Sequence, residues 1–299
     1  MTSEEYHGDS ITELEWAQGE RDLTDEREVP EAYEPNYRRM TNEEYHKHPA
    51  LSNSGISILL DRPSKYYHQV ILEERESTAA MTFGSAFHCA VLEPVKYTND
   101  YAVNPHDGRT KAGKEWAANN TNKTILSSAD AELIEKMRDG IGKNALARTL
   151  IMEPGLVEES YFWTDIITGV VCKCRPDKIV TVDERVIVLD LKTTDDASPE
   201  SFAKSVANYG YHRQAYWYTQ GLEANGTDVD EFIFVACEKK PPHECALYVI
   251  DPGDIERARA QCDYAIDLFS RCKERNNWPG LGDKITTVSL PAWYKQEAI

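Results

Sequence analysis

The 299-residue sequence has no apolar run near the roughly 20 residues that a membrane-spanning helix requires. Its acidic beginning is also unlike a secretory signal peptide, which opens with basic residues. Also missing are a Walker-type phosphate loop, a glycine-rich dinucleotide turn after a strand and a nucleophile elbow. These absences argue against a membrane partner, nucleotide-binding enzymes and α/β-hydrolases.

Basic residues are also scarce. The sequence has 33 Lys and Arg against 51 Asp and Glu, which gives a net charge of −18. Residues 1–36 carry 12 of the acidic and 2 of the basic side chains. We expect residues 1–39 to be a disordered or weakly helical extension and residues 40–299 to form the folded domain. The extension could be an inert tail, a protein-binding arm or a DNA mimic. Any DNA-binding surface of the domain must be a local cluster of Lys and Arg.

The seven cysteines are an odd number spread over apolar segments, which fits a reducing cytoplasm. Cys172 and Cys174 lack a second pair at metal-finger spacing, so buried thiols are the favoured interpretation.

The most informative pattern is Arg175-Pro176-Asp177 followed by Asp190-Leu191-Lys192. Both motifs lie in or beside apolar, β-branched runs at 169–180 and 186–191, which predict two strands joined by a polar turn. Alternation along a strand places Asp190 and Lys192 on one face, and pairing of the strands would bring Asp177 to the same face. Two carboxylates and a lysine suit a hard divalent cation, a phosphodiester and an attacking water. An Asp-X-Lys triplet by itself is most often solvated. Here, however, Asp190 and Lys192 lie at the end of a strand that is expected to be buried on both faces, where ionised groups need partners.

The ordered motifs resemble the PD-(D/E)XK nuclease superfamily and, within it, the RecE-type (exonuclease VIII-like) exonucleases of phages and prophages. The resemblance runs from about residue 40 to 296 and rests on Leu51–Ser57 with Pro63–Tyr67, Phe83–His88, Gly169–Asp177, Asp190–Thr194, Gln214–Tyr218, Trp278–Gly280 and Leu290–Tyr294. Some related nucleases hold an iron–sulfur cluster with four cysteines, but the cysteines after residue 236 do not reproduce that grouping well.

From this resemblance we assign Asp177 and Asp190 as Mg²⁺ ligands, together with the peptide carbonyl of Leu191. Lys192 is expected to orient the nucleophilic water or neutralise charge in the transition state. A histidine on a small-residue helix is usually a core residue, but the resemblance implies that His88 lies at the metal. An imidazole ligand would also make Mn²⁺ well tolerated.

The extra acidic ligand upstream is expected to be Glu159, with Glu158 left open because strand register decides between them. Glu93 is a weaker candidate. Gln214 and Tyr218 share a helix face and could be an ordinary amphipathic stripe, whereas the resemblance implies that Gln214 acts near the nucleophile and that Tyr218 supports it.

The pattern of the rest of the chain predicts a mixed α/β fold with a restriction-endonuclease-like core, a central mixed β-sheet flanked by helices. We expect helices at 54–60, 63–74, 79–92, 128–150 (interrupted at 140–142), 198–225 (broken at 208–210) and 254–275. The polar stretch 99–125 is expected to be a loop or to hold a short helix near 111–118, and further strands are expected at 157–164, 232–237 and 246–250.

The predicted function is a Mg²⁺-dependent exodeoxyribonuclease that digests linear double-stranded DNA. The resemblance implies 5′→3′ polarity, 3′ tails passed to a single-strand annealing protein, a ring-like homo-oligomer such as a tetramer, and the cytoplasm of a bacterial host. A structure-specific or single-strand endonuclease of the same fold, or a non-catalytic DNA- or protein-binding relative, are the alternatives.

Overall fold

The computed structural model describes residues 37–38, 40–73, 78–282 and 284–290. Residues 1–39, which are expected to be disordered or weakly helical, therefore lie almost wholly outside the described residues. The same holds for the end of the C-terminal motif, 291–294. No helix in the described part of the chain combines the length and apolarity that crossing a membrane would need.

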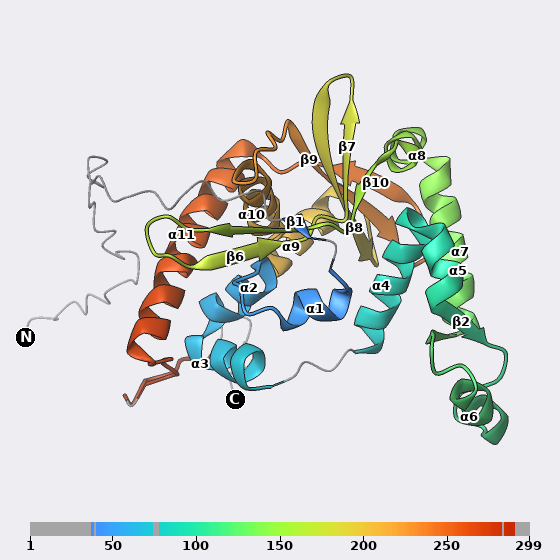
Figure 1. Cartoon of the computed structure of the whole chain (residues 1–299), viewed down its shortest axis with the longest axis horizontal. Coiled ribbons are helices and arrows are strands. Elements are labelled where there is room, and N and C mark those ends of the chain that lie inside the picture. The colour runs from blue at the N-terminus through green and yellow to red at the C-terminus, as the bar shows by residue number, and fades with distance from the viewer. Residues whose placement is uncertain (1–36, 39, 74–77, 283, 291–299) are drawn as a thin grey trace, which may run out of the picture. The chain divides into compact units, whose positions relative to one another are not determined.

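A five-stranded mixed sheet lies at the centre of the domain (Figure 1). Its strands run in the order β10 (Cys245–Tyr248), β9 (Glu231–Glu238), β8 (Arg185–Thr194), β7 (Lys178–Val182) and β4 (Gly155–Val157). Only β8 and β9 are parallel; the other neighbouring pairs are antiparallel. The expected strand pair is confirmed, because β7 and β8 form a hairpin whose turn residues, Asp183 and Glu184, both have positive φ.

Two smaller sheets accompany the central one. The first has the order β1 (Tyr37–Arg38), β5 (Ser160–Thr164) and β6 (Val171–Cys174), and the second pairs β2 (Tyr101–Asn104) with β3 (Thr124–Ser127) in parallel. The helices are α1 (Asn42–Lys47), α2 (Asn53–Asp61), α3 (Pro63–Tyr66) continued by a π-helical turn (Tyr67–Leu72), α4 (Ala79–Leu92), α5 (Pro94–Asp100), α6 (Lys111–Ala118), α7 (Ser128–Lys143), α8 (Ala145–Met152), α9 (Pro199–Tyr209), α10 (Tyr211–Glu223) and α11 (Pro252–Arg275).

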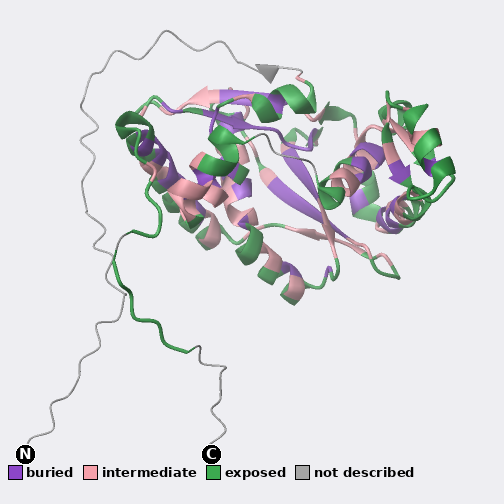
Figure 2. Ribbon diagram, turned by 90° about the horizontal axis from the view of Figure 1, so that it is seen from below, coloured by how far each residue is buried: buried purple, intermediate pink, exposed green. Residues whose placement is uncertain are grey.

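Alternation along the central strands divides the core into two layers. Val188, Phe232 and Phe234 pack toward the side of α10 and α11, whereas Leu191 and Val235 pack with α4 and α7 on the other. Figure 2 shows the central strands as mainly buried between helices whose outer faces are exposed. The predicted mixed sheet flanked by helices is thus confirmed, and the buried strands leave few positions at which a charged side chain would be tolerated.

Three predicted element boundaries are wrong. The run 157–164 forms parts of two strands in different sheets, because the chain turns at Glu158, whose φ is 53°. The run 169–180 is likewise divided between β6 and β7 by Arg175-Pro176-Asp177. The segment 128–150 is interrupted at Asn144, which caps α8, and not at 140–142. In addition, the polar stretch 99–125 contributes residues to β2 and β3 on either side of the expected helix at α6.

Candidate active site

The two motif aspartates meet in the central sheet as the sequence predicts. Lys178 on β7 pairs with Leu189 on β8, so the next pair in this antiparallel register is Asp177 with Asp190. Asp177 is additionally fixed because its Oδ2 accepts the Leu191 backbone N–H at 2.7 Å. Both carboxylates are buried, with 8% of Asp177 and none of Asp190 exposed. Two buried carboxylates side by side are unfavourable unless cations compensate them.

Asp190 is held by one cation and one amide. The Lys192 ammonium forms an ion pair with Asp190 Oδ1, and Gln214 on α10 donates from Nε2 to Oδ2 at 2.5 Å. Lys192 in turn lies over the rings of Tyr211, at 4.7 Å from the centroid, and Phe234, at 5.6 Å. Asp190 and Lys192 therefore do share a strand face, and Gln214 reaches that face from the helix.

A second group of possible ligands forms around Asp177. One ligand atom each from His88, Glu158 and Asp177 lies within 4.8 Å of the others, and His88 Nδ1 is 3.3 Å from Asp177 Oδ2. These residues come from α4, from the turn between β4 and β5, and from the residue before β7. The fold thus brings together three side chains that lie 70 and 19 positions apart along the sequence.

The turn between β4 and β5 decides which glutamate reaches the site. Glu158 has a φ of 53° and donates its backbone N–H to the Asp177 carbonyl at 3.1 Å, which aligns it with the motif aspartate. Glu159 is buried, with 4% exposed, and is not a member of the group. The structure therefore favours Glu158, the alternative that the sequence left open, over Glu159.

Burial and mutual charge shift the acidity of these groups strongly. Burial raises the pKa of Asp190 to about 6 against the opposing effect of Lys192, and burial together with Asp177 raises the pKa of Glu158 to about 7. Burial alone would lower the pKa of His88, but the Asp177 carboxylate outweighs it and the pKa of His88 rises to about 9. Burial works against the ionised form of Asp177, yet His88 and Lys192 keep its pKa below the ordinary value. The cluster thus holds protons that a cation can displace.

Tyr218 and Leu191 are the other two predicted site residues, and the structure shows their positions but does not test their roles. Tyr218 lies one turn beyond Gln214 on α10, packs against Phe232, and has a pKa raised far above its usual range, first by burial and then by negative groups that include Asp190. For Leu191 the structure gives a contact of its N–H with Asp177, whereas the predicted ligand is its carbonyl. Both roles stay predictions. Tyr211, whose ring contacts Lys192, is not among the predicted site residues, although its position three residues before Gln214 places it on the same helix face.

The donor set fits a divalent cation. Carboxylate oxygens and an imidazole converge within one coordination sphere, and the Asp190 carboxylate lies beside them. Mg²⁺ prefers oxygen ligands and keeps some of its waters, while an imidazole is also suited to Mn²⁺. His88, Glu158 and Asp177 would hold such an ion, with Asp190 adjacent.

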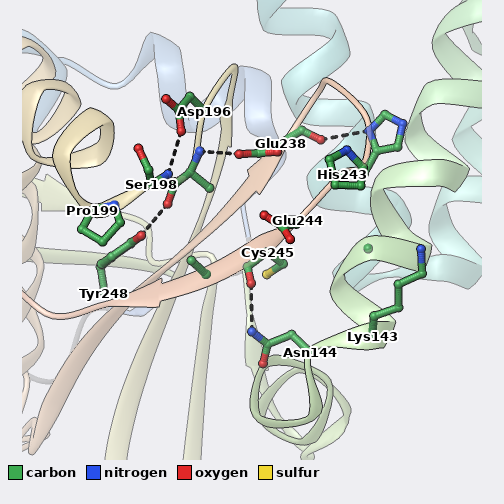
Figure 3. Close-up of a pocket in the computed structure, with 14 residues that line it drawn as sticks. Lys143, Asn144, Asp196, Ser198, Pro199, Glu238, His243, Glu244, Cys245 and Tyr248 are labelled. Carbon is green, nitrogen blue, oxygen red and sulfur yellow. Dashed lines mark hydrogen bonds between the residues drawn. The ribbon is translucent and has the colours of Figure 1, made fainter.

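A separate cavity of about 680 Å³ lies at the end of β8 and β9 (Figure 3). Asn144 donates to the Cys245 carbonyl on one side, and Tyr248 donates to the Ala197 carbonyl on the other. None of the candidate active-site residues lines it, so the carboxylate site is not part of this cavity.

Comparison with known proteins agrees with this geometry. Residues 63–291 match a family described as a PDDEXK-like domain of unknown function. No curated protein is significantly similar in sequence. Among solved structures, one from Eubacterium rectale, described as a presumed exonuclease, has a TM-score of 0.56 at 14% identity and covers 85% of this chain and 97% of its own. Another, SSO0001, has a TM-score of 0.31 at 13% identity over 63% of this chain and 85% of its own, and supports no argument.

The structural similarity indicates a shared fold, and the family match covers well over half of the chain, including every residue of the candidate site. The chain therefore belongs to the PDDEXK-like domain family and has the restriction-endonuclease-like core of the PD-(D/E)XK nuclease superfamily.

Proposed function

We propose that this protein is a metal-dependent exonuclease that digests linear double-stranded DNA. The observation that carries the proposal is the convergence of His88, Glu158 and Asp177 beside the buried Asp190–Lys192 pair. Carboxylates with a lysine suit phosphodiester hydrolysis, because a hard cation and an ammonium together can neutralise the charge that develops on the phosphate.

The side chains have distinct roles in this proposal. A bound Mg²⁺ would supply Lewis-acid polarisation of the phosphate and a more acidic water. Lys192 is held by Asp190 and by two aromatic rings, so its ammonium is fixed in place before the substrate binds. Gln214 fixes Asp190 from the helix and prevents rotation of that carboxylate. Because these groups are ordered before substrate arrives, little reorganisation is needed in the transition state.

The finer assignment extends the resemblance to RecE-type exonucleases. On this proposal the enzyme uses Mg²⁺, accepts Mn²⁺, degrades from 5′ to 3′, and leaves 3′ tails for a single-strand annealing partner in a bacterial cytoplasm. A ring-like homo-oligomer such as a tetramer would enclose the DNA. Enclosure would also reduce the difficulty posed by the net charge of −18, since only the inner surface must be basic.

Digestion of linear duplex DNA labelled separately at its 5′ and 3′ ends, beside a covalently closed circle, tests this proposal. We expect metal-dependent release from the 5′ end, with the circle intact and with no release by Asp190→Ala. Cutting of the circle would instead indicate an endonuclease. A folded protein that cleaves neither substrate with any metal would favour the alternative of a non-catalytic binding protein.

A further inference from the structure

Arg175 forms a buried link between the two chain segments that carry Glu158 and Asp177. It lies two residues before Asp177, and its guanidinium donates to Ser160 Oγ from both Nε, at 2.8 Å, and Nη2, at 2.6 Å. Ser160 follows Glu158 by two residues and is fully buried, while Arg175 is 8% exposed. One side chain thus fixes the end of β6 relative to the start of β5.

The same guanidinium holds a segment that lies before the family match. Arg175 Nη2 donates to the Met40 carbonyl at 3.0 Å, and the guanidinium lies 4.4 Å from the ring centroid of Tyr45 on α1. Lys173 lies over the same ring at 4.5 Å and donates to the His48 carbonyl at 2.7 Å. Residues 40–48 therefore cover Arg175 and limit the directions that its fork can take.

The chemistry of this link is unusual for a purely structural contact. Among the described residues, every hydrogen-bond acceptor of Arg175 is a neutral oxygen, and burying a guanidinium without a bonded carboxylate costs free energy. The charge lies close enough to Glu158 to interact with it electrostatically. A planar fork with fixed donor directions suits precise placement better than an apolar side chain does.

We propose that Arg175 is a positioning residue for the metal site, and that it sets the distance between Glu158 and Asp177 through its two bonds to Ser160. This inference rests on the proposed function, because it assumes a divalent cation at His88, Glu158 and Asp177. It adds the requirement that a residue outside the first coordination sphere determines metal affinity.

The variant Arg175→Lys separates the effect of the guanidinium's geometry from the effect of its charge. It keeps the positive charge but cannot donate two bonds to one hydroxyl, so a change in metal affinity reports the fork. Loss of an outer-sphere partner weakens metal binding by about 10- to 100-fold in known sites. We expect Arg175→Lys to weaken Mn²⁺ binding by about tenfold or more, and Ser160→Ala to weaken it in the same direction.

The test measures Mn²⁺ binding to the full-length protein by calorimetry, with circular dichroism as the check on folding. Lys173→Met is the matched control, because Lys173 lies over the same ring and donates to the Tyr45 and His48 carbonyls. It should lower the melting temperature and leave Mn²⁺ affinity within about threefold. Raised Mn²⁺ should restore DNA cleavage by Arg175→Lys.

Wild-type affinity in folded Arg175→Lys would overturn the proposal, as would equal losses in Arg175→Lys and Lys173→Met. If Arg175→Lys does not fold, Ser160→Ala decides, and unchanged affinity in that variant overturns the proposal. Absence of any Mn²⁺ binding that depends on Asp177, tested with Asp177→Asn, would refute the metal site itself and with it the proposed function.

Discussion

Metal binding should release a defined number of protons, because His88 and, in part, Glu158 are protonated in the metal-free protein. With a pKa of about 9, His88 carries nearly one proton at pH 7, and Glu158, with a pKa of about 7, carries half of one. Asp190, with a pKa of about 6, contributes only about a tenth. Binding at pH 7 should therefore release about 1.5 protons, and binding at pH 5 about three, because all three groups are then largely protonated.

Calorimetric titration with Mn²⁺ in buffers of different ionisation enthalpy measures this number. His88→Asn should reduce the release at pH 7 by about one proton while it weakens binding. Metal affinity itself should fall as the pH is lowered from 7 to 5, by about tenfold per pH unit for each proton released, His88 included. Release near zero at pH 7, or affinity that is flat between pH 5 and 7, would refute the proposed ligand set.

Three further results are expected. Glu158→Gln should abolish metal binding measured by calorimetry, whereas Glu159→Gln should retain it, and the reverse result would restore the assignment made from sequence. Lys192→Met should lower the single-turnover cleavage rate by about 100-fold or more while metal still binds, and an unchanged rate would exclude Lys192 from the chemistry. Trp217→Ala should destabilise the fold by about 3–5 kcal/mol in denaturant unfolding, because this side chain is 1% exposed and donates to a buried strand carbonyl; a loss below about 1 kcal/mol would contradict the described packing.

The pH dependence of stability without metal gives an independent check. The folded-state pKa values of Glu158 and Asp190 are raised, so the folded protein keeps their protons at a pH where the unfolded chain has lost them. Their contribution to stability is therefore full below about pH 4 and falls as the pH rises to about 7. We expect the melting temperature of Glu158→Gln to decline less over this range than that of the wild type, and parallel curves would contradict the shift.

The strand motif could be located from sequence because two local signals coincide. The β-branched run before Asp190 predicts a strand, and period-two alternation alone places Asp190 and Lys192 on one face. The polar turn at Asp183 and Glu184 predicts the hairpin that brings Asp177 beside them. These features depend on residues close together in the chain, so the local sequence pattern is sufficient to predict the hairpin and the carboxylates that it brings together.

The local sequence pattern could not decide whether Glu158 or Glu159 is the additional acidic ligand. An unbroken strand over 157–164 would place Glu158 and Glu159 on opposite faces, but the chain turns at Glu158 with a positive φ, which a non-glycine residue rarely adopts. The turn is stabilised from outside the segment, by the bond to the Asp177 carbonyl.

A contact from outside the segment also explains why the helix interruption predicted at 140–142 is wrong. The glycines at 140 and 142 predict a break in the helix, yet helix α7 continues through them. A Cβ at Gly140 would lie 1.9 Å from the His243 carbonyl oxygen, so this glycine permits the close approach of a distant hairpin. Tertiary packing, which no local pattern reports, decides both cases.

The most direct test of the central claim is single-turnover cleavage of an end-labelled DNA duplex as Mg²⁺ is varied, in the wild type, Asp177→Asn and Asp190→Asn. The account predicts a saturable metal dependence in the wild type, no cleavage in chelator, and losses of at least about 100-fold in both variants at saturating metal. Cleavage that persists in chelator, or that survives in either folded variant, would contradict a hydrolytic centre at these carboxylates.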